Sequence, residues 1–327
     1  MIAEVIRSGF EESRHRGSAV LLGADGREVF RMGEVIAPML PRSSNKPMQA
    51  AAMRACGLAV DGELLALAAA SHSGEDFHVT GVRKILASAG LTEDALQCPP
   101  ALPLDEAALW RLLRDGGGPD RVHMNCSGKH AAMLATSVAA GWPTETYRDP
   151  DHPLQREIKA AIGRLAGEAV AATGVDGCGA PLFAISLTGL ARAFRALVLA
   201  DPHSPERSVA DAVRAHPAWT SGTARSENAL HQAVPGLLIK SGAEGVQAFA
   251  LADGRAGAVK IEDGAPRAIP AITVALLRNF GADREEGVDR EALDRIAHIP
   301  VLGGGQPVGE IRVTLPANAD RGQPGIR

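Results

Sequence analysis

Residues 236–261 read GLLIKSGAEGVQAFALADGRAGAVKI, a stretch in which apolar runs alternate with turn-forming residues. It contains three short apolar runs, at residues 237–240, 246–252 and 256–261. Each run is shorter than a typical helix, and Gly, Asp and Glu residues separate the runs. This pattern is typical of strands joined by turns. We therefore predict that this part of the chain forms three strands.

The beginning of the chain has the same character. Residues 17–23 (GSAVLLG) are largely apolar, ADG at residues 24–26 is typical of a hairpin turn, and residues 28–36 resume an extended pattern. A last alternating run covers residues 308–315. Strands at both ends of the chain predict one mixed, mainly antiparallel sheet built from both termini.

The middle of the chain is mostly helical in its pattern. A helix is predicted at residues 43–56, because Ser43, Ser44 and Asn45 are good N-cap residues and Pro47 is tolerated in a first turn. Further helices are predicted at residues 76–89, 106–114, 128–140, 154–165, 187–197, 205–215, 226–233, 270–279 and 290–296. The predicted fold class is therefore α+β, with a helix-rich part packed on the sheet.

The length of 327 residues allows one large domain or two smaller ones. The segments at residues 116–119 and 217–223 are typical of loops and not of domain linkers. We therefore expect a single domain over residues 1–317. The last residues, 318–327 (NADRGQPGIR), are predicted to form a polar tail.

The composition excludes several classes of protein. A net charge of -4, with acids and bases interspersed, lacks the electrostatic footprint of a nucleic-acid-binding protein. Aromatic residues make up only 3% of the chain, which argues against a stacking platform for bases. No apolar stretch is long enough to span a bilayer. We therefore expect neither nucleic acid nor a membrane among the partners.

The N-terminal sequence MIAEVIRSGFEESRHRG has early acids and no apolar core, unlike a secretory signal. We therefore expect a cytoplasmic protein. In that compartment the four cysteines, Cys56, Cys98, Cys126 and Cys178, are not expected to form disulfides.

Lysine is scarce in this chain, with six lysines among 34 basic residues, and three of the six lie in segments rich in Gly and Ser. Arginine cannot lose its proton inside a protein, whereas a buried lysine can act as a base or as a neutral ligand. The first of the three is Lys46, in Ser43-Ser44-Asn45-Lys46. Residues i and i+3 share one face of a helix, so the amine can reach the Ser43 hydroxyl and activate it. The alternative is an N-cap serine beside a solvated lysine.

The second is Lys240, in Lys240-Ser241-Gly242 at the end of a predicted strand. A strand carrying Lys-Thr/Ser-Gly downstream of Ser-x-x-Lys is the arrangement of serine β-lactamases and penicillin-binding proteins. The alternative is a strand that ends in a solvated lysine and a turn. A second serine–histidine segment, Ala70-Ser71-His72-Ser73-Gly74-Glu75, is either functional or a helix cap, and its serine is a candidate partner of Lys240.

The third is Lys129, in Asn125-Cys126-Ser127-Gly128-Lys129-His130. Together with Cys178 in Asp176-Gly177-Cys178-Gly179 it offers two thiolates and a nitrogen donor, a set that suits zinc. Lysine is an unusual ligand because its amine must first lose a proton. The alternative is two buried thiols beside a helix N-terminus.

Taken together, these motifs resemble the bacterial thermolabile L-asparaginase II family, whose fold is similar to those of serine β-lactamases and bacterial serine glutaminases. The resemblance covers residues 10–315. The matching motifs are RSSNKP at residues 42–47, ASHSGED at 70–76, NCSGKH at 125–130, DHP at 151–153, DGCGAP at 176–181 and VKIEDG at 259–264.

The resemblance implies an L-asparagine amidohydrolase that forms L-aspartate and ammonia through a serine acyl-enzyme, and it implies a homodimer. It also implies roles for ten residues. Ser43 would be the nucleophile and Lys46 its base, and Ser71 and Lys240 would form a second serine–lysine couple. The remaining roles are a zinc ion bound by Cys126, Lys129 and Cys178, and substrate contacts from Arg42, His130 and Asp176.

Three other activities are compatible with parts of the pattern. A β-lactamase or penicillin-binding protein would need an exported chain and a Ser-x-Asn element, and Ser226-Glu227-Asn228 lies very near Lys240 in the sequence. Glutaminase activity would use the same residues on a substrate that is one methylene longer. A zinc-stabilised binding protein would hydrolyse no amide. The residue Lys260, in VKIEDG, has no predicted role.

Overall fold

The structure is a computed structural model, and it describes residues 1–316. The predicted polar tail, residues 318–327, lies outside the described residues. The fold combines helices with antiparallel sheets, so the predicted α+β class is confirmed. Over residues 1–316, no helix combines the length and the apolar character that crossing a membrane requires.

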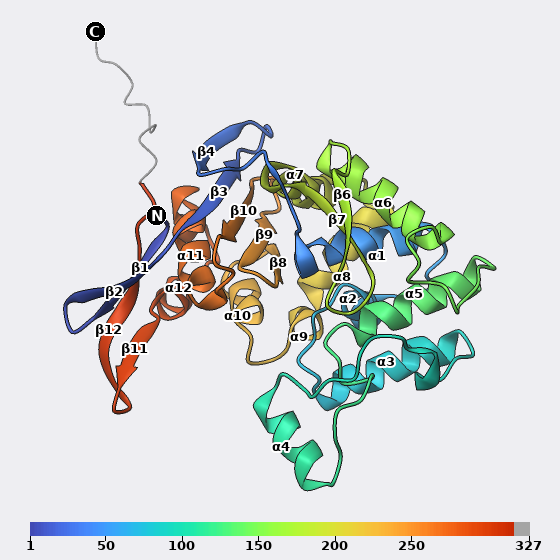
Figure 1. Cartoon of the computed structure of the whole chain (residues 1–327). Coiled ribbons are helices and arrows are strands. Elements are labelled where there is room, and N and C mark those ends of the chain that lie inside the picture. Colours follow the sequence, from blue (N-terminus) through green and yellow to red (C-terminus); the bar gives the residue numbers. More distant parts are fainter. Residues whose placement is uncertain (317–327) are drawn as a thin grey trace.

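The central sheet has five strands, and both ends of the chain contribute to it (Figure 1). Their order is β4 (Glu28–Met32), β3 (Gly17–Leu22), β10 (Ala256–Ile261), β9 (Val246–Ala250) and β8 (Leu238–Gly242). The three predicted strands at residues 237–261 are therefore adjacent, and β10 joins them to β3 near the N-terminus. This confirms the prediction that the two ends of the chain meet in one sheet.

Both faces of the central sheet are covered, which explains why its inner strands β3, β10 and β9 are largely apolar. In β3, Val20 and Leu22 contribute to the core shared with α7 (Leu187–Leu199). The intervening Leu21 points to the opposite face and contributes to the core shared with α11 (Ile269–Asn279). Side chains of a strand alternate between faces, so one run of small and branched apolar residues serves both cores.

Two further sheets correct the prediction of a single mixed sheet. Every strand pair among the described residues is antiparallel, and the predicted last strand pairs with β1 instead of joining the central sheet. A four-stranded sheet has the order β11 (Pro300–Gly303), β12 (Gln306–Val313), β1 (Ala3–Arg7) and β2 (Phe10–His15). A three-stranded sheet has the order β5 (Pro38–Met39), β7 (Pro181–Ser186) and β6 (Ala172–Val175).

The helices of the middle of the chain pack beside the central sheet (Figure 1). They occur close to the predicted ranges, with α2 and α9 as additional helices. The helix α9 (Pro217–Thr220) lies in the segment 217–223 that was predicted to be a loop, and Pro217 at its first position is compatible with a helix start. They are α1 (Lys46–Ala55), α2 (Gly62–Ala68), α3 (Asp76–Ser88), α4 (Glu106–Arg114), α5 (Ser127–Ala139), α6 (Pro153–Ala166), α8 (Pro205–Ala215), α9 (Pro217–Thr220), α10 (Ser226–Ala233) and α12 (Arg290–Ala297). Short 3-10 turns are η1 (Arg42–Asn45), η2 (Glu93–Ala95), η3 (Pro266–Ala268) and η4 (Ala282–Arg284).

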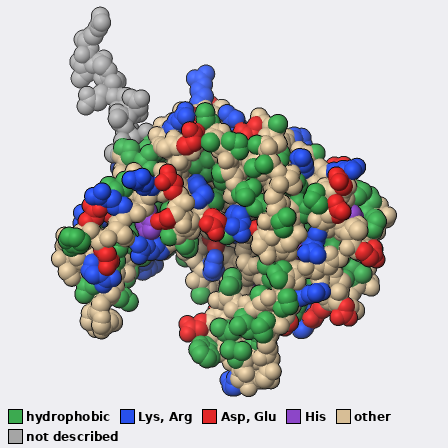
Figure 2. Space-filling view, viewed as in Figure 1, with side chains coloured by type: hydrophobic (Ala, Val, Ile, Leu, Met, Phe, Trp, Pro, Cys, Tyr) green, Lys and Arg blue, Asp and Glu red, His purple; other side chains and the backbone are tan. Residues whose placement is uncertain are grey.

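The arrangement places β8 where the sheet meets the helical part. It is an edge strand of the central sheet, and it packs against the turn η1 and the helix α10. Figure 2 shows a wide hollow on this side of the molecule, between the lobe of the four-stranded sheet and the lobe that carries α4. The predicted serine and lysine motifs of Ser43 and Lys240 therefore meet at one junction.

Candidate active site

Ser43 lies on the short 3-10 turn η1, which leads directly into α1. The predicted helix at residues 43–56 thus begins at Lys46, with Ser43 in the turn before it. The preceding residue, Arg42, has a φ of 51°, in the left-handed region that non-glycine residues rarely adopt. Such a conformation costs about 1–3 kcal/mol and occurs often at functional sites. The Ser44 N–H and hydroxyl both donate to the Pro41 carbonyl, which helps to fix the turn.

Strand β8 approaches this turn at Gly242, and the approach requires a glycine. A Cβ atom on Gly242 would lie 2.5 Å from the Pro41 carbonyl oxygen and 3.2 Å from the Ser44 nitrogen. Both neighbours are backbone atoms, so they could not move aside without displacing the turn. The glycine of the Lys-Ser-Gly motif therefore allows the strand edge to lie against the turn that carries Ser43.

Lys46 is fully buried at the start of α1, and its amine makes three hydrogen bonds. The Nζ atom donates to the Ala70 carbonyl at 2.6 Å, to Ser71 Oγ at 2.9 Å and to Cys126 Sγ at 3.1 Å. The predicted pairing joined Lys46 to Ser43, whereas the hydrogen bonds of residues 1–316 join it to Ser71. The structure therefore connects the lysine of the first motif with the serine of the second.

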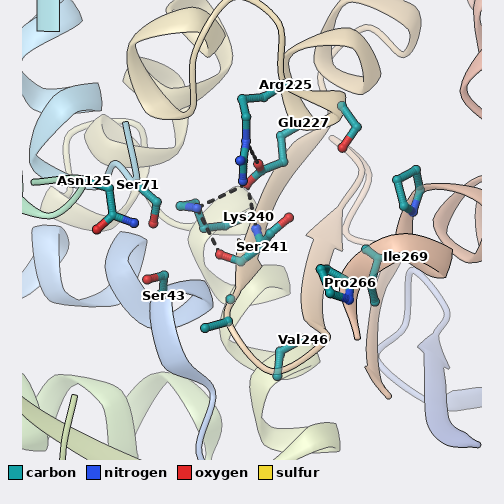
Figure 3. A pocket seen from close by; sticks show the side chains of 14 residues that line it. Ser43, Ser71, Asn125, Arg225, Glu227, Lys240, Ser241, Val246, Pro266 and Ile269 are labelled. Carbon is teal, nitrogen blue, oxygen red and sulfur yellow. Dashed lines mark hydrogen bonds and ion pairs between the residues drawn. The ribbon is translucent and has the colours of Figure 1, made fainter. Parts of the chain in front are cut away.

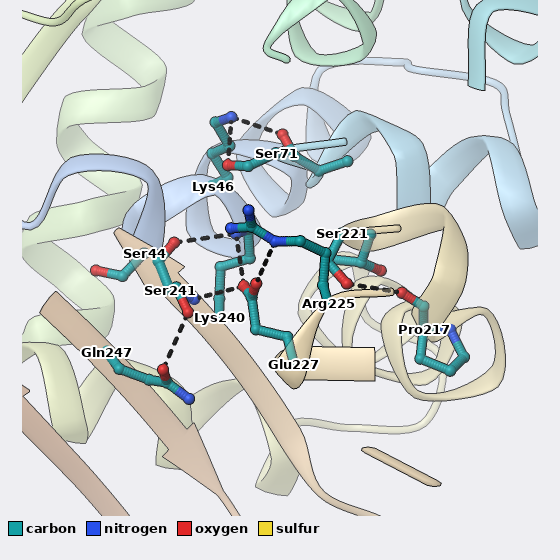
Figure 4. A network of polar contacts seen from close by, with 12 residues as sticks. Ser44, Lys46, Ser71, Pro217, Ser221, Arg225, Glu227, Lys240, Ser241 and Gln247 are labelled. Atoms are coloured by element: carbon teal, nitrogen blue, oxygen red, sulfur yellow. Dashed lines mark hydrogen bonds and ion pairs between the residues drawn. The ribbon is translucent and has the colours of Figure 1, made fainter. Parts of the chain in front are cut away.

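Lys240 is buried on β8, and it forms an ion pair with Glu227 of α10 (Figure 4). Its Nζ lies 3.2 Å from Glu227 Oε1, and it also donates to the Ser241 carbonyl at 3.0 Å. The same Glu227 oxygen accepts the Ser241 N–H at 2.9 Å. The predicted pairing of Lys240 with Ser71 is not among the hydrogen bonds of the described chain, although both residues line one cavity.

The charges of this pair are set by burial and by each other. Burial lowers the pKa of Lys240, and the neighbouring Glu227 carboxylate offsets part of that effect. Burial alone would raise the pKa of Glu227. The positive charges of Lys240 and Arg225 and the Ser241 N–H outweigh it and lower that pKa to about 2. Glu227 is therefore a carboxylate at neutral pH.

A cavity of about 260 Å³ brings the predicted residues together (Figure 3). Its wall includes Ser43, Ser71 and Lys240, together with Asn125 and Arg225. Pockets for drug-sized ligands usually reach 300–1,000 Å³. A smaller cavity with hydroxyl, amide and charged groups on its wall fits a small polar molecule.

The three predicted substrate contacts are not among the residues that line this cavity. Arg42 Nε donates to Asp176 Oδ1 at 2.8 Å, and Arg42 Nη1 lies 3.7 Å from Glu244. His130 is buried, with Nδ1 2.6 Å from the Tyr147 hydroxyl. Arg42 and Asp176 therefore link the turn of Ser43 to the segment of Cys178, while their contact with substrate stays a prediction.

Cys126, Lys129 and Cys178 are all buried, and Cys126 contacts Lys46. Lys129 Nζ donates to Cys178 Sγ at 3.1 Å. A hydrogen bond from Cys126 and the charge of Lys129 lower the pKa of Cys178, and together they outweigh the effect of burial. The same hydrogen bond and burial raise the pKa of Cys126. The sulfur of Cys178 thus faces the lysine amine.

The donor set of these residues fits zinc in its chemistry, because Zn²⁺ accepts thiolate sulfur and nitrogen. The Nε2 atom of buried His130 has no hydrogen-bond partner within residues 1–316, and burial lowers the pKa of this imidazole while the neighbouring Cys178 raises it. Lys129 would have to release its proton to bind a metal, and the nearby thiols raise its pKa despite burial. Among the described residues, no group of three or more His, Cys, Asp and Glu side chains is arranged as a metal site, so a site here depends on the lysine.

The sequence reasoning missed the roles of Arg225 and Glu227. In the sequence, Ser226-Glu227-Asn228 resembles only a Ser-x-Asn element. In the structure, Asn228 Nδ2 donates to the Thr223 carbonyl, so its amide closes the turn before α10, and Glu227 enters the site instead. The only available signal was a charged residue 13 positions before Lys240, and sequence distance alone does not predict an ion pair.

The arrangement of a serine on a strained turn, buried lysines and a polar cavity defines a candidate hydrolase site. The chain matches the family model of L-asparaginase II over residues 3–313, and it belongs to this family. The resemblance found in the sequence is thereby confirmed, and the protein is a hydrolase that acts on amides. No curated protein matches the chain by sequence.

Several solved structures have a distantly similar fold. A β-lactamase from Mycobacterium bovis is 17% identical, with a TM-score of 0.45, and the match covers 81% of this chain and 94% of that one. A putative β-lactamase from Bacteroides dorei is 15% identical, with a TM-score of 0.43 and the same two coverages. Mglu in its native form is 15% identical, with a TM-score of 0.44, and the match covers 82% of this chain and 64% of Mglu. The chain thus spans less than two thirds of Mglu. These likenesses are too distant to support an assignment, which depends on the family model.

Proposed function

We propose that the protein hydrolyses the side-chain amide of L-asparagine, giving L-aspartate and ammonia, with Ser43 as the nucleophile. The observation that supports this most is the position of Ser43. It lies on a strained turn at the wall of a small cavity that it shares with Ser71 and Lys240. Within an asparaginase II family, this placement fits attack on a small amide.

In the proposed first step, Ser43 Oγ attacks the amide carbon and its proton passes to Ser71 Oγ. Ser71 gives its own proton to Lys46, which must be neutral at that moment, across the 2.9 Å hydrogen bond. The proton then returns along the same path to the leaving nitrogen, and ammonia departs. Water repeats the sequence on the acyl-enzyme, so that aspartate is released and Ser43 regains its proton.

The oxyanion of the tetrahedral intermediate needs two hydrogen-bond donors. The backbone N–H groups of Ser43 and Ala243 are our candidates. Ala243 follows β8 directly and lines the cavity. No hydrogen bond of residues 1–316 occupies either N–H group. The close approach of β8 at Gly242 places these two parts of the backbone side by side.

Zinc, where bound, would be held by Cys126, Lys129 and Cys178. A divalent cation there would supply positive charge close to Lys46, which contacts Cys126 at 3.1 Å. The metal site and the proton-transfer path therefore touch at one atom. In this proposal the residues of the chain carry the proton transfers, and the metal supports substrate binding.

Ammonia release from L-asparagine tests the proposal, with L-glutamine as the comparison. The wild-type protein is expected to release ammonia from asparagine, and Ser43→Ala is expected to release none while keeping its folded circular dichroism spectrum. Ser13→Ala, which removes a hydroxyl on β2 in the separate four-stranded sheet, serves as the control. Ammonia release by the Ser43→Ala protein would refute the assignment of the nucleophile.

A further inference from the structure

The wall of the cavity carries more positive than negative charge. Arg225 and Lys240 are its cations, and Glu227 is its one carboxylate among the lining residues. Glu227 is buried, and its Oε1 is already occupied by Lys240 and by the Ser241 N–H. One positive charge therefore remains for a ligand, which favours a molecule that presents a carboxylate to this wall.

Arg225 is the cation that remains accessible. Its side chain is 43% exposed, whereas Lys240 is almost completely buried. Its Nε atom faces Glu227 Oε2 at 3.6 Å, which fixes the direction of the guanidinium group. No hydrogen bond within residues 1–316 uses either terminal nitrogen of the Arg225 guanidinium group. Figure 4 shows the group lying beside Glu227 and Lys240.

Arg42 does not offer the same possibility. Its Nε atom donates to Asp176, and its Nη1 atom lies 3.7 Å from Glu244, so two carboxylates already compensate its charge. Arg42 is also absent from the cavity wall, whereas Arg225 is part of it. The two arginines near the site therefore differ in what they can bind.

We propose that Arg225 is a specificity-determining residue that binds the α-carboxylate of the substrate through its two terminal nitrogens, and that Glu227 holds its guanidinium group in place. This proposal rests on the proposed function, because it takes the substrate to be a free amino-acid amide. A planar guanidinium can bind a carboxylate with two parallel hydrogen bonds, which a lysine cannot. In Figure 3, Arg225 and Ser43 lie on different sides of Lys240, so one end of the substrate is held while the other reacts.

The proposal predicts discrimination between substrates. L-Asparagine carries the carboxylate, whereas L-asparagine N-methylamide has a neutral group in its place and the same side-chain amide. The protein should therefore prefer asparagine, and it should exclude asparagine residues whose carboxyl group is part of a peptide bond.

The test compares kcat/KM for ammonia release from these two substrates. Arg225→Gln should lower kcat/KM for asparagine by about 10- to 150-fold, the range of a charge-assisted hydrogen bond, and leave the methylamide unchanged. Arg225→Lys should recover part of the loss. The matched control is Arg31→Gln on the opposite edge strand β4, whose side chain is 47% exposed and lies 3.9 Å from Glu28. A loss that is equal for both substrates, or no loss, would overturn the proposal.

A failure of the proposed function gives a different result. In that case the wild-type protein releases no ammonia from asparagine, and binding is measured instead. Calorimetric titration with L-aspartate should then show binding to the wild-type protein and loss of binding in Arg225→Gln. Absence of binding to the wild-type protein, or equal binding to both proteins, would overturn the assignment of Arg225.

Discussion

Replacing Glu227 by glutamine removes the only negative charge on the cavity wall and leaves Lys240 buried without its partner. The magnitude follows from the structure. The pKa of Glu227 falls from 4.5 to about 2 on folding, and at about 1.36 kcal/mol per unit this difference corresponds to about 3 kcal/mol of stability at neutral pH. Removing one partner of a buried ion pair typically costs about 3–5 kcal/mol, in agreement. For a chain of 327 residues, we expect Tm to fall by about 5 °C.

The dependence on pH has a defined sign. The pKa of the Glu227 carboxyl is lower in the folded protein than in the unfolded chain, so its stabilisation is present above pH 4.5 and is lost as the pH falls towards 2. The difference in free energy of unfolding between the wild-type protein and Glu227→Gln should therefore shrink in acid. The difference in free energy of unfolding should also shrink in alkali, where Lys240 loses its proton. A neutral lysine needs no carboxylate partner, and burial already lowers the pKa of Lys240.

Urea denaturation at several pH values measures this difference, and Glu12→Gln is the control. Glu12 pairs with Arg7 at 2.8 Å, but both side chains are more than 40% exposed. An exposed pair of this kind contributes less than about 1 kcal/mol. Equal effects of the two substitutions at pH 7, or a Glu227→Gln effect that does not depend on pH, would refute the reasoning about the buried pair.

Three other substitutions probe neighbouring parts of the site. Gly242→Ala should displace the turn of Ser43, because the added Cβ would lie 2.5 Å from the Pro41 carbonyl oxygen. We expect the rate of ammonia release to fall by about 100-fold and the free energy of unfolding, measured by urea denaturation, to fall by about 1–3 kcal/mol. Lys46→Arg should abolish ammonia release, because arginine cannot lose a proton, and an active Lys46→Arg protein would exclude Lys46 as the base. Cys178→Ser should lower the zinc content of purified protein, measured by elemental analysis, and unchanged zinc would place the metal elsewhere.

Much of the fold was predictable because its central strands are apolar and short. The runs at residues 237–240, 246–252 and 256–261 became β8, β9 and β10 almost as predicted. The hairpin of β1 and β2 was not predicted, since FEESRH in β2 is polar and largely exposed and resembles a loop in sequence. The strand β2 pairs only with β1, and β1 in turn pairs with β12 at the other end of the described chain, a contact that local sequence does not encode.

The site was predictable as a set of residues but not as a set of contacts. The sequence motifs identified Ser43, Ser71 and Lys240, and the structure brings them to one cavity. Which lysine contacts which serine depends on how α1 packs against the segment after α2, and i, i+3 spacing does not encode that. The ion pair of Lys240 with Glu227 likewise depends on where α10 docks on β8.

The central claim is that Ser43 carries the acyl group during amide hydrolysis. The most direct measurement is mass spectrometry of peptides from a reaction with L-asparagine that is quenched in acid during turnover. We expect an aspartyl group on the peptide that contains Ser43, and its absence in Ser43→Ala. An aspartyl group on the peptide that contains Ser71 would contradict the account, because Ser71 would then be the nucleophile and Lys46 its direct partner.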